Sequence, residues 1–385
     1  MAIIAERPAV RALQPSLIRK LANTAIGRSD VIPLWFGEPD KPTPEFIRQA
    51  AKDAIDEGQT FYQPSLGLGE LRSALAEYTN RLYDASVSPE NIVVTPSGMT
   101  ALTVALQCIV ADGAAVVVPS PVWPNVAGAA EILGAEIVRV PIRPQAGVWT
   151  LDLDELFAAC PPHTGALAVN SPNNPTGWML EDDEQQRILD FCRERDIWLI
   201  ADEVYNRIVY DRERAPSFAN KVTDDDKYLL INSFSKSWAM TGWRLGWLTA
   251  PSSLVGTLGM VGEFNFSCVF APTQFAGVTA LQEGEAFIKE SRERYRAGRD
   301  LVASRLADLP RVTFPTPRAA FYAFFAVDGV ADSYSFALRV LRECGVGLTP
   351  GAAFGPQGEG YLRLCFAAEL ALLERALTQL RPLLT

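Results

Sequence analysis

Between residues 92 and 250, short apolar runs rich in β-branched residues alternate with helical stretches. This alternation limits the possible fold more than any other feature. The seven runs cover residues 92–95, 115–119, 136–141, 166–170, 198–202, 228–232 and 245–250, and helical spacing appears between them at 100–110, 126–133 and 182–194. Strands separated by helices form parallel sheets with helices on both faces. We therefore predict an α/β fold with a mostly parallel seven-stranded sheet flanked by helices.

The rest of the chain follows a different order. Helical patterns occupy residues 45–57 and 68–83, and a long charged helix is predicted at 287–306. Strands near 312–314, 321–326 and 361–366 then mix with helices, which is typical of an α+β unit. We expect a large domain over residues 46–285 and a smaller α+β domain built from residues 1–45 together with 286–385.

Composition and charge exclude several classes of protein. Hydrophobic residues make up 48% of the chain and charged residues 21%, which is too apolar for a disordered protein. The 35 Lys and Arg against 45 Asp and Glu give a net charge of −10, so nucleic acid and anionic membranes are poor partners. No apolar stretch approaches the roughly 18 residues of a membrane helix, and residues 1–11 lack an export signal. We expect a cytoplasmic protein that binds small molecules.

Residue usage also excludes several chemistries. The chain has a single histidine, His163, and six cysteines that lie far apart in the sequence. Zinc clusters and His-ligated metal sites, like Ser-His-Asp or Cys-His nucleophiles, need histidines or clustered cysteines. We therefore predict no metal site, and reactive chemistry must come from carboxylates, lysines or a bound cofactor.

An unusual variety of polar residues follows the predicted strands. In open α/β sheets, ligands bind beyond the carboxyl ends of the strands, so these residues should meet at one site. The Ser97-Gly98-Met99 turn opens a helix, whose free amides suit a phosphate. The other strands are followed by an aromatic ring, an amide, a carboxylate with a phenol, and an amine with a guanidinium: Trp123, Asn174, Asp202 with Tyr205, and Lys236 with Arg244.

This inventory is what pyridoxal phosphate requires. The cofactor needs a lysine for its Schiff base and an acidic partner that keeps its ring nitrogen protonated. Lys236 and Asp202 are the natural pair for those two tasks.

Several motifs, in their order along the chain, resemble the class I family of fold-type I pyridoxal-phosphate-dependent aminotransferases, with its aspartate and aromatic members. The motifs are Gly37-Glu38-Pro39-Asp40, Asn173-Asn174-Pro175-Thr176-Gly177, Ser233-Phe234-Ser235-Lys236 and Arg363-Leu364-Cys365-Phe366-Ala367. The resemblance implies a homodimer with shared active sites. It also implies transfer of an amino group to a 2-oxo acid by a ping-pong mechanism.

The resemblance further implies a role for each site residue. Lys236, Asp202 and Tyr205 are the implied catalytic residues, and Lys236 also moves the proton of the substrate. The implied cofactor-binding residues are Ser97, Gly98, Met99, Trp123, Asn174, Asp202, Tyr205, Ser233, Ser235, Lys236, Arg244 and Tyr62, the last reaching across the subunit interface. Gly37, Asn174 and Arg363 are implied to bind the substrate, with Arg363 gripping its α-carboxylate through two parallel hydrogen bonds.

The class of amino donor remains a hypothesis. Residues 264–275 are expected to approach the neighbouring active site and contain no Lys or Arg, which with Trp35, Phe36 and Trp243 favours an apolar or aromatic donor. Lys41, Arg11 or Arg19 could instead bind a second carboxylate, so an aspartate-type enzyme stays an alternative. A β-lyase or synthase on the same fold and cofactor is a further alternative. The acceptor, 2-oxoglutarate or pyruvate, follows only from the family.

Overall fold

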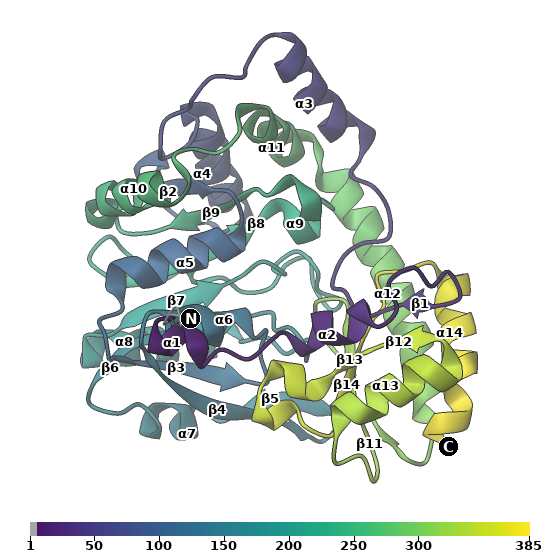
Figure 1. Cartoon of the computed structure of the whole chain (residues 1–385). Coiled ribbons are helices and arrows are strands. Elements are labelled where there is room, and N and C mark those ends of the chain that lie inside the picture. Colours follow the sequence, from purple (N-terminus) through teal and green to yellow (C-terminus); the bar gives the residue numbers. More distant parts are fainter. Residues whose placement is uncertain (1–5) are drawn as a thin grey trace, which may run out of the picture.

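The computed structural model describes residues 6–385, and its largest element is a sheet of eight strands (Figure 1). Its order in space is β2-β9-β8-β7-β6-β3-β4-β5. The strands are β2 (Ile92–Thr95), β3 (Ala115–Ser120), β4 (Glu136–Gln145), β5 (Val148–Leu151), β6 (Thr164–Asn170), β7 (Trp198–Asp202), β8 (Tyr228–Ser233) and β9 (Gly246–Thr249). The five central strands from β8 to β4 pair in parallel, which confirms the predicted α/β class.

The sheet differs from the prediction in strand number and in one direction. All seven predicted strands are present, but β5 adds an eighth by folding back on β4 in a hairpin. The strand β9 runs antiparallel to both neighbours, β2 and β8. The connection from β8 to β9 contains only the four-residue helix α9 (Phe234–Ser237) and a 3₁₀ turn (Thr241–Trp243). The chain therefore turns back at the same sheet edge, because a parallel return needs a longer crossover.

Helices cover both faces of this sheet. Val116 and Val118 pack with α5 (Gly98–Ile109), α6 (Asn125–Ile132) and α10 (Ser252–Phe266), whereas Val117 packs with α7 (Leu153–Ala158) and α8 (Asp182–Arg195). Side chains of a strand alternate between faces, and here both faces are apolar. Three further helices, α3 (Glu45–Asp56), α4 (Gly69–Tyr83) and α11 (Ala271–Glu283), pack together beside β2 and β9.

A second, smaller sheet lies beside the first and contains strands from the C-terminal third of the chain. Its order is β10-β11-β14-β13, with β10 (Val312–Thr313), β11 (Tyr322–Val327), β13 (Thr349–Pro350) and β14 (Tyr361–Cys365). Its core includes α2 (Leu17–Asn23), α12 (Glu285–Ala307), α13 (Ser333–Cys344) and α14 (Leu370–Leu384), which gather at the lower right of Figure 1. The predicted division into domains of 46–285 and 1–45 with 286–385 stays a prediction.

The N-terminal segment joins this second region. β1 (Ile32–Pro33) pairs in parallel with β12 (Val346–Gly347), and α1 (Pro8–Arg11) precedes α2. This pairing brings β1 to the late part of the chain, whereas α1 lies beside α6, where Arg7 donates to the carbonyl of Ile132 over 3.3 Å. Within residues 6–385, none of the helices combines the length and the apolar character needed to span a bilayer.

Candidate active site

The strand ends that carry the predicted residues meet at one edge of the large sheet. Asn170 and Asp202, the last residues of β6 and β7, are register partners. Gly246, the first residue of β9, lies between Ser233 at the end of β8 and Thr95 at the end of β2. The antiparallel direction of β9 therefore places its beginning, and the preceding Arg244, at the edge where the parallel strands end.

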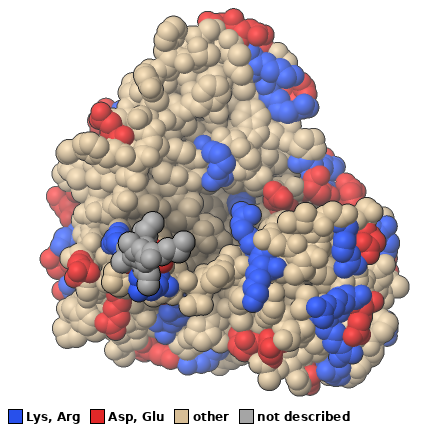
Figure 2. All heavy atoms as spheres, in the orientation of Figure 1, with Lys and Arg blue, Asp and Glu red and all other residues tan. Residues whose placement is uncertain are grey.

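A cavity of about 500 Å³ opens at this edge. Figure 2 shows this face of the molecule hollowed near its middle, with Lys and Arg side chains around the hollow. A volume in this range suits a small ligand. Its lining includes every predicted site residue except Tyr62, namely Gly37, Ser97, Gly98, Met99, Trp123, Asn174, Asp202, Tyr205, Ser233, Ser235, Lys236, Arg244 and Arg363.

The beginning of α5 forms one wall of the cavity. Ser97 caps the helix, and its Oγ accepts a hydrogen bond of 3.0 Å from the Thr100 amide. The amides of Gly98 and Met99 then have no partner within the helix, because the first turn lacks preceding carbonyls. A side chain at Gly246 would clash with this turn, since a Cβ there would lie 2.5 Å from the Gly98 nitrogen. The turn thus sits directly on the backbone of β9.

Hydroxyl groups and a guanidinium line the wall next to α5. Ser233 caps α9, and its Oγ lies 2.9 Å from the Oγ of Ser235. Arg244 has left-handed backbone angles, with φ of 57°, and donates to the carbonyl of Thr241 over 2.7 Å. Free amides, hydroxyls and an arginine form a donor set suited to a phosphate.

Lys236 points into the cavity from α9. Its Nζ donates a 2.6 Å hydrogen bond to the carbonyl oxygen of Gly37. Burial lowers the pKa of this amine to about 8, because a charged ammonium loses its hydration there. The nearby Arg363 and Arg244 lower the pKa further, while Cys365 and Glu38 oppose them. At neutral pH roughly a tenth of the amine is then neutral and nucleophilic, far more than for an exposed lysine.

Asp202 supplies a buried carboxylate at the end of β7. Burial raises its pKa to about 6, against the opposing effects of the Val204 amide and of Lys236. The Val204 amide donates to Oδ1 over 3.2 Å, and Oδ2 has no hydrogen-bond partner within residues 6–385. At neutral pH the group is mostly ionised, so Oδ2 can accept a hydrogen bond from a cationic ring nitrogen.

Tyr205 and Tyr322 form a pair of phenols that sequence reasoning found only in part. Their hydroxyl oxygens are 2.7 Å apart, and both rings are buried. Tyr322 also lines the cavity, although it was predicted only as part of a strand. Its neighbours from Phe321 to Phe325 are nearly all apolar. In sequence, Tyr322 is therefore indistinguishable from a core tyrosine.

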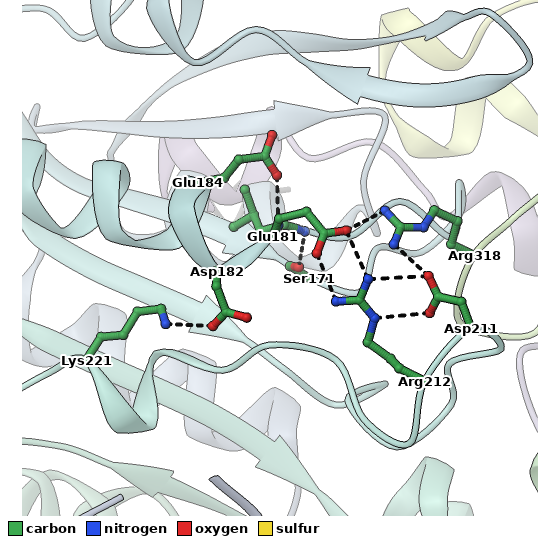
Figure 3. A network of polar contacts seen from close by, with 9 residues as sticks. Ser171, Glu181, Asp182, Glu184, Asp211, Arg212, Lys221 and Arg318 are labelled. Carbon is green, nitrogen blue, oxygen red and sulfur yellow. Dashed lines mark hydrogen bonds and ion pairs between the residues drawn. The ribbon is translucent and has the colours of Figure 1, made fainter. Parts of the chain in front are cut away.

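The segment that leads to Tyr322 is fixed to the loops of the large sheet. Arg318 forms ion pairs with Glu181 at 2.6 Å and Asp211 at 2.7 Å, and Arg212 also pairs with both acids (Figure 3). An isolated bridge links Val209 to Ala319 next to these ion pairs. The segment just before Tyr322, the first residue of β11, is therefore held by the ion pairs of Arg318 and by the bridge at Ala319.

Arg363 lies deep in the cavity on β14. Its Nη1 donates to the side-chain oxygen of Asn174 over 2.8 Å, and its Nη2 donates to the carbonyl of Trp35 and, at 3.3 Å, to Thr349. The buried Nε has no hydrogen-bond partner among the residues described. A buried unpaired donor is costly and favours a ligand acceptor, such as a carboxylate.

The mouth of the cavity contains one of the three cations named in the sequence analysis. Arg19 on α2 lines the cavity with Phe36, and its side chain has no hydrogen bond or ion pair within residues 6–385. Arg11 and Lys41 do not line it, and Lys41 lies 4.0 Å from Glu369. Trp35 and Trp243 are also absent from the lining, as is the segment 264–275.

Tyr62 stands apart from the other predicted residues. It is 90% exposed and lies outside the cavity of its own chain. Phe61 beside it is 82% exposed, and Phe264 is 88% exposed. The prediction that Tyr62 serves a second subunit is not tested by a single chain.

Comparisons with known proteins give a consistent result. The family described as "Aminotransferase class I and II" matches residues 29–380. Aspartate aminotransferase of Pyrococcus abyssi and aromatic-amino-acid aminotransferase 2 of Thermococcus litoralis are each 36% identical over 376 residues, 97% of this chain and 96% of theirs. The structure of aspartate aminotransferase from Thermus thermophilus with maleate is 32% identical, with a TM-score of 0.92, and the match covers 99% of this chain and 100% of that one.

Proposed function

The chain belongs to the class I and II aminotransferases. We propose that it binds pyridoxal phosphate in this cavity and transfers the amino group of an apolar or aromatic L-amino acid to a 2-oxo acid. The observation that carries the proposal is that Lys236, Asp202 and Arg363 line one cavity. Amino-group transfer needs an amine that binds the cofactor covalently, a carboxylate that pairs with its ring nitrogen, and a guanidinium that binds the substrate carboxylate. These three residues supply those groups in that order.

The donor set at α5 fits the phosphate end of the cofactor. The free amides of Gly98 and Met99, the hydroxyls of Ser233 and Ser235, and the Arg244 guanidinium would bind its anionic oxygens. The close backbone contact at Gly246 keeps the helix start in place. We propose Ser97 as the cap that leaves these amides free.

The remaining walls fit the ring and the aldehyde. We propose that Trp123 stacks on the ring, that Asp202 binds its nitrogen, and that Tyr205 and Asn174 hydrogen-bond its phenolic oxygen. When bound, pyridoxal phosphate supplies an aldehyde for amines and an electron-accepting ring that lowers the barrier to loss of the substrate Cα proton.

Lys236 is proposed as the base that moves the substrate proton. Its lowered pKa provides a neutral amine near working pH, which a general base needs. The Gly37 carbonyl, 2.6 Å from Nζ, holds the amine on the cavity side. Lys236 would accept the proton from Cα and return it elsewhere on the bound molecule.

Arg363 is proposed to hold the α-carboxylate of both substrates. Hydrogen bonds to Asn174 and to the Trp35 carbonyl fix the plane of its guanidinium, and its buried Nε has no acceptor among the described residues, so it can donate to a carboxylate. Fixing the carboxylate orients the Cα–H bond for Lys236, and such positioning contributes strongly to rate. Gly37 would add a backbone contact.

A dicarboxylate substrate is the second candidate, and Arg19 is the observation that favours it. Arg19 is a cation at the mouth of the cavity without a protein partner within residues 6–385. A second carboxylate on aspartate, or on 2-oxoglutarate as acceptor, would complement it. An enzyme that binds an apolar amino donor and an acidic acceptor in turn needs an apolar surface and a cation in the same cavity.

Single-substrate spectroscopy tests the proposed function. Single amino acids are added to the cofactor-loaded protein without any oxo acid, and the absorption spectrum is recorded. Conversion of the aldehyde-derived band to a pyridoxamine band with phenylalanine or leucine is expected. The Lys236→Ala variant should lose it. A persistent band with accumulation of pyruvate and ammonia from an amino acid that carries a leaving group on Cβ, such as cysteine, would instead favour the β-lyase alternative.

The same measurement separates the two substrate classes. The Arg19→Ala variant is expected to lose about tenfold in apparent affinity for aspartate or 2-oxoglutarate, as for one exposed charge-assisted contact, and little for phenylalanine. Lys20→Ala, on the same helix but outside the lining, is the matched control. Equal apparent affinities of the two variants for every substrate would contradict a role of Arg19 in substrate binding.

A further inference from the structure

Tyr322 is a buried side chain of the cavity that the proposed roles leave unused. Its ring is fully buried, and its hydroxyl lies 2.7 Å from that of Tyr205. No other hydrogen-bond partner of the Tyr322 hydroxyl exists within residues 6–385. The Tyr322 hydroxyl is therefore committed to Tyr205.

Two further site residues meet the same ring. The Arg363 guanidinium lies over the ring of Tyr322, with 4.3 Å from Cζ to the ring centroid. Gly37 packs so closely that a Cβ there would clash with the Tyr322 hydroxyl. Tyr322 thus touches the substrate arginine, the Gly37 backbone and the phenol of Tyr205 at once.

The proton count of the phenol pair has a chemical consequence. Burial raises the pKa of both phenols, so both carry their protons at neutral pH. The two phenols carry two hydroxyl hydrogens, and the hydrogen bond between them uses one of these, which leaves the other free to be donated. If Tyr322 donates, the Tyr205 proton remains available for an acceptor in the cavity, and donation from Tyr322 strengthens it as a donor.

We propose that Tyr322 donates its hydroxyl hydrogen to Tyr205 and thereby directs the Tyr205 hydroxyl toward the bound cofactor, while its ring supports the Arg363 guanidinium. Tyr322 is then a positioning residue with two separable parts. The hydroxyl acts on the cofactor through Tyr205, and the ring acts on the substrate carboxylate through Arg363. This inference rests on the proposed function.

The hydroxyl is tested with Tyr322→Phe, which keeps the ring. Without the donor, the Tyr205 hydrogen bond to the phenolic oxygen of the cofactor weakens. That oxygen is then a more basic anion and holds its shared proton more tightly. The apparent pKa of the absorption change of the bound cofactor is expected to rise by about half a unit to one unit. Affinity for a non-reactive carboxylate analogue should stay within about twofold.

The ring is tested with Tyr322→Leu, which removes both parts. The same rise in the spectroscopic pKa is expected, and the analogue should bind about tenfold more weakly, as expected for the loss of a desolvated cation–π contact. Tyr210→Phe is the matched control. It removes a buried phenolic hydrogen bond to the Ala320 carbonyl outside the cavity. This variant should leave both readouts unchanged.

A double variant shows whether the hydroxyl acts through Tyr205. In a Tyr205→Phe protein, adding Tyr322→Phe is expected to change the spectroscopic pKa no further. Additive shifts, or an unchanged pKa in Tyr322→Phe alone, would overturn the proposal. Should Tyr322→Phe not fold, Gly37→Ala displaces the same hydroxyl and must raise the pKa likewise.

The wild-type titration separates this inference from the proposed function. A wild-type protein that gains no cofactor absorption band contradicts the proposed function itself. A wild-type protein that binds the cofactor and titrates, with Tyr322→Phe identical to it, contradicts only the role of Tyr322.

Discussion

At the scale of single residues, the protonation state of Lys236 governs the chemistry of the cavity. Its Nζ is buried, so an ammonium loses its hydration there, and two arginines lie nearby; both effects disfavour the charged form. A lysine with a pKa of about 8 is half neutral at pH 8, where an exposed lysine is almost fully charged.

The pH dependence of cofactor capture should follow this pKa. Only the neutral amine attacks an aldehyde, so the rate of band formation with pyridoxal phosphate should rise about fivefold from pH 7 to 8 and level off by about pH 9. Stopped-flow absorbance of the cofactor-free protein measures it. A rate that still rises tenfold per pH unit near pH 9 would assign Lys236 an ordinary pKa.

Residue types and spacing located most of the cavity because strand ends meet at one edge. Lys236 and Asp202 were expected at one edge because each follows a predicted strand, whereas Arg363 was named only from the family resemblance; all three line the cavity, and their roles stay predictions. Tyr322 could not be predicted, because its role depends on a contact with Tyr205, 117 positions away. Arg19 could not be separated from Arg11 and Lys41 for the same reason: only the folded chain shows which cation reaches the mouth.

At the scale of elements, the contact between β9 and the start of α5 places the proposed phosphate site. Gly246 has no room for a side chain because the Gly98 nitrogen and the Ser97 carbonyl carbon lie within 2.6 Å of its Cβ position. The helix start would have to move away from Ser235 and Arg244 if that space were filled.

A single added methyl group tests this contact. Gly246→Ala is expected to displace the helix start and weaken pyridoxal phosphate binding about fivefold to a hundredfold, since overpacking costs about 1–3 kcal/mol. A cofactor titration followed by tryptophan fluorescence measures the affinity, and circular dichroism checks the fold.

Gly242→Ala is the control for that variant. Nothing lies within 4 Å of a Cβ at Gly242, and its φ is not left-handed. Its affinity and melting temperature should match those of the wild type. Equal affinity in both alanine variants would show that the helix start tolerates the shift.

The one strand missed by the sequence prediction also has a local cause. β5 follows β4 through a two-residue turn in which Ala146 and Gly147 both have positive φ, at 51° and 82°. Such hairpin turns usually carry Asn-Gly or Asp-Gly, because alanine is strained in the left-handed region. With alanine at this position, the sequence has no turn signal, and residues 148–151 are too short to be recognised alone.

At the scale of the whole molecule, the exposed position of Tyr62 bears on the proposed homodimer. Its ring does not line the cavity of its own chain, and Phe61 and Phe264 are also largely exposed. The Gln63 amide donates to Cys268 over 3.4 Å, so the two segments that carry these rings meet, and apolar side chains exposed together are typical of a surface covered by another protein.

Mixed dimers test whether Tyr62 crosses between subunits. Proteins with Lys236→Ala and with Tyr62→Phe are each expected to be impaired, the second by about tenfold in cofactor affinity through loss of one hydrogen bond to a charged group. Co-expressed with different tags, they should form a dimer with one fully intact site. Purified mixed dimers are expected to show about half the wild-type activity per dimer. Activity no higher than that of a Tyr62→Phe site would place Tyr62 in its own subunit.

The cavity is lined by residues from α2 near the beginning of the sequence and from β14 near its end. During synthesis, the sheet from β2 to β9 can leave the ribosome and begin to fold long before Arg363 is translated. A nascent chain would therefore already contain Lys236 and the proposed phosphate site while still lacking Arg363, the proposed binding residue for the substrate carboxylate. Capture of the cofactor can precede capture of any substrate by the time needed to translate more than a hundred residues from Lys236 to Arg363.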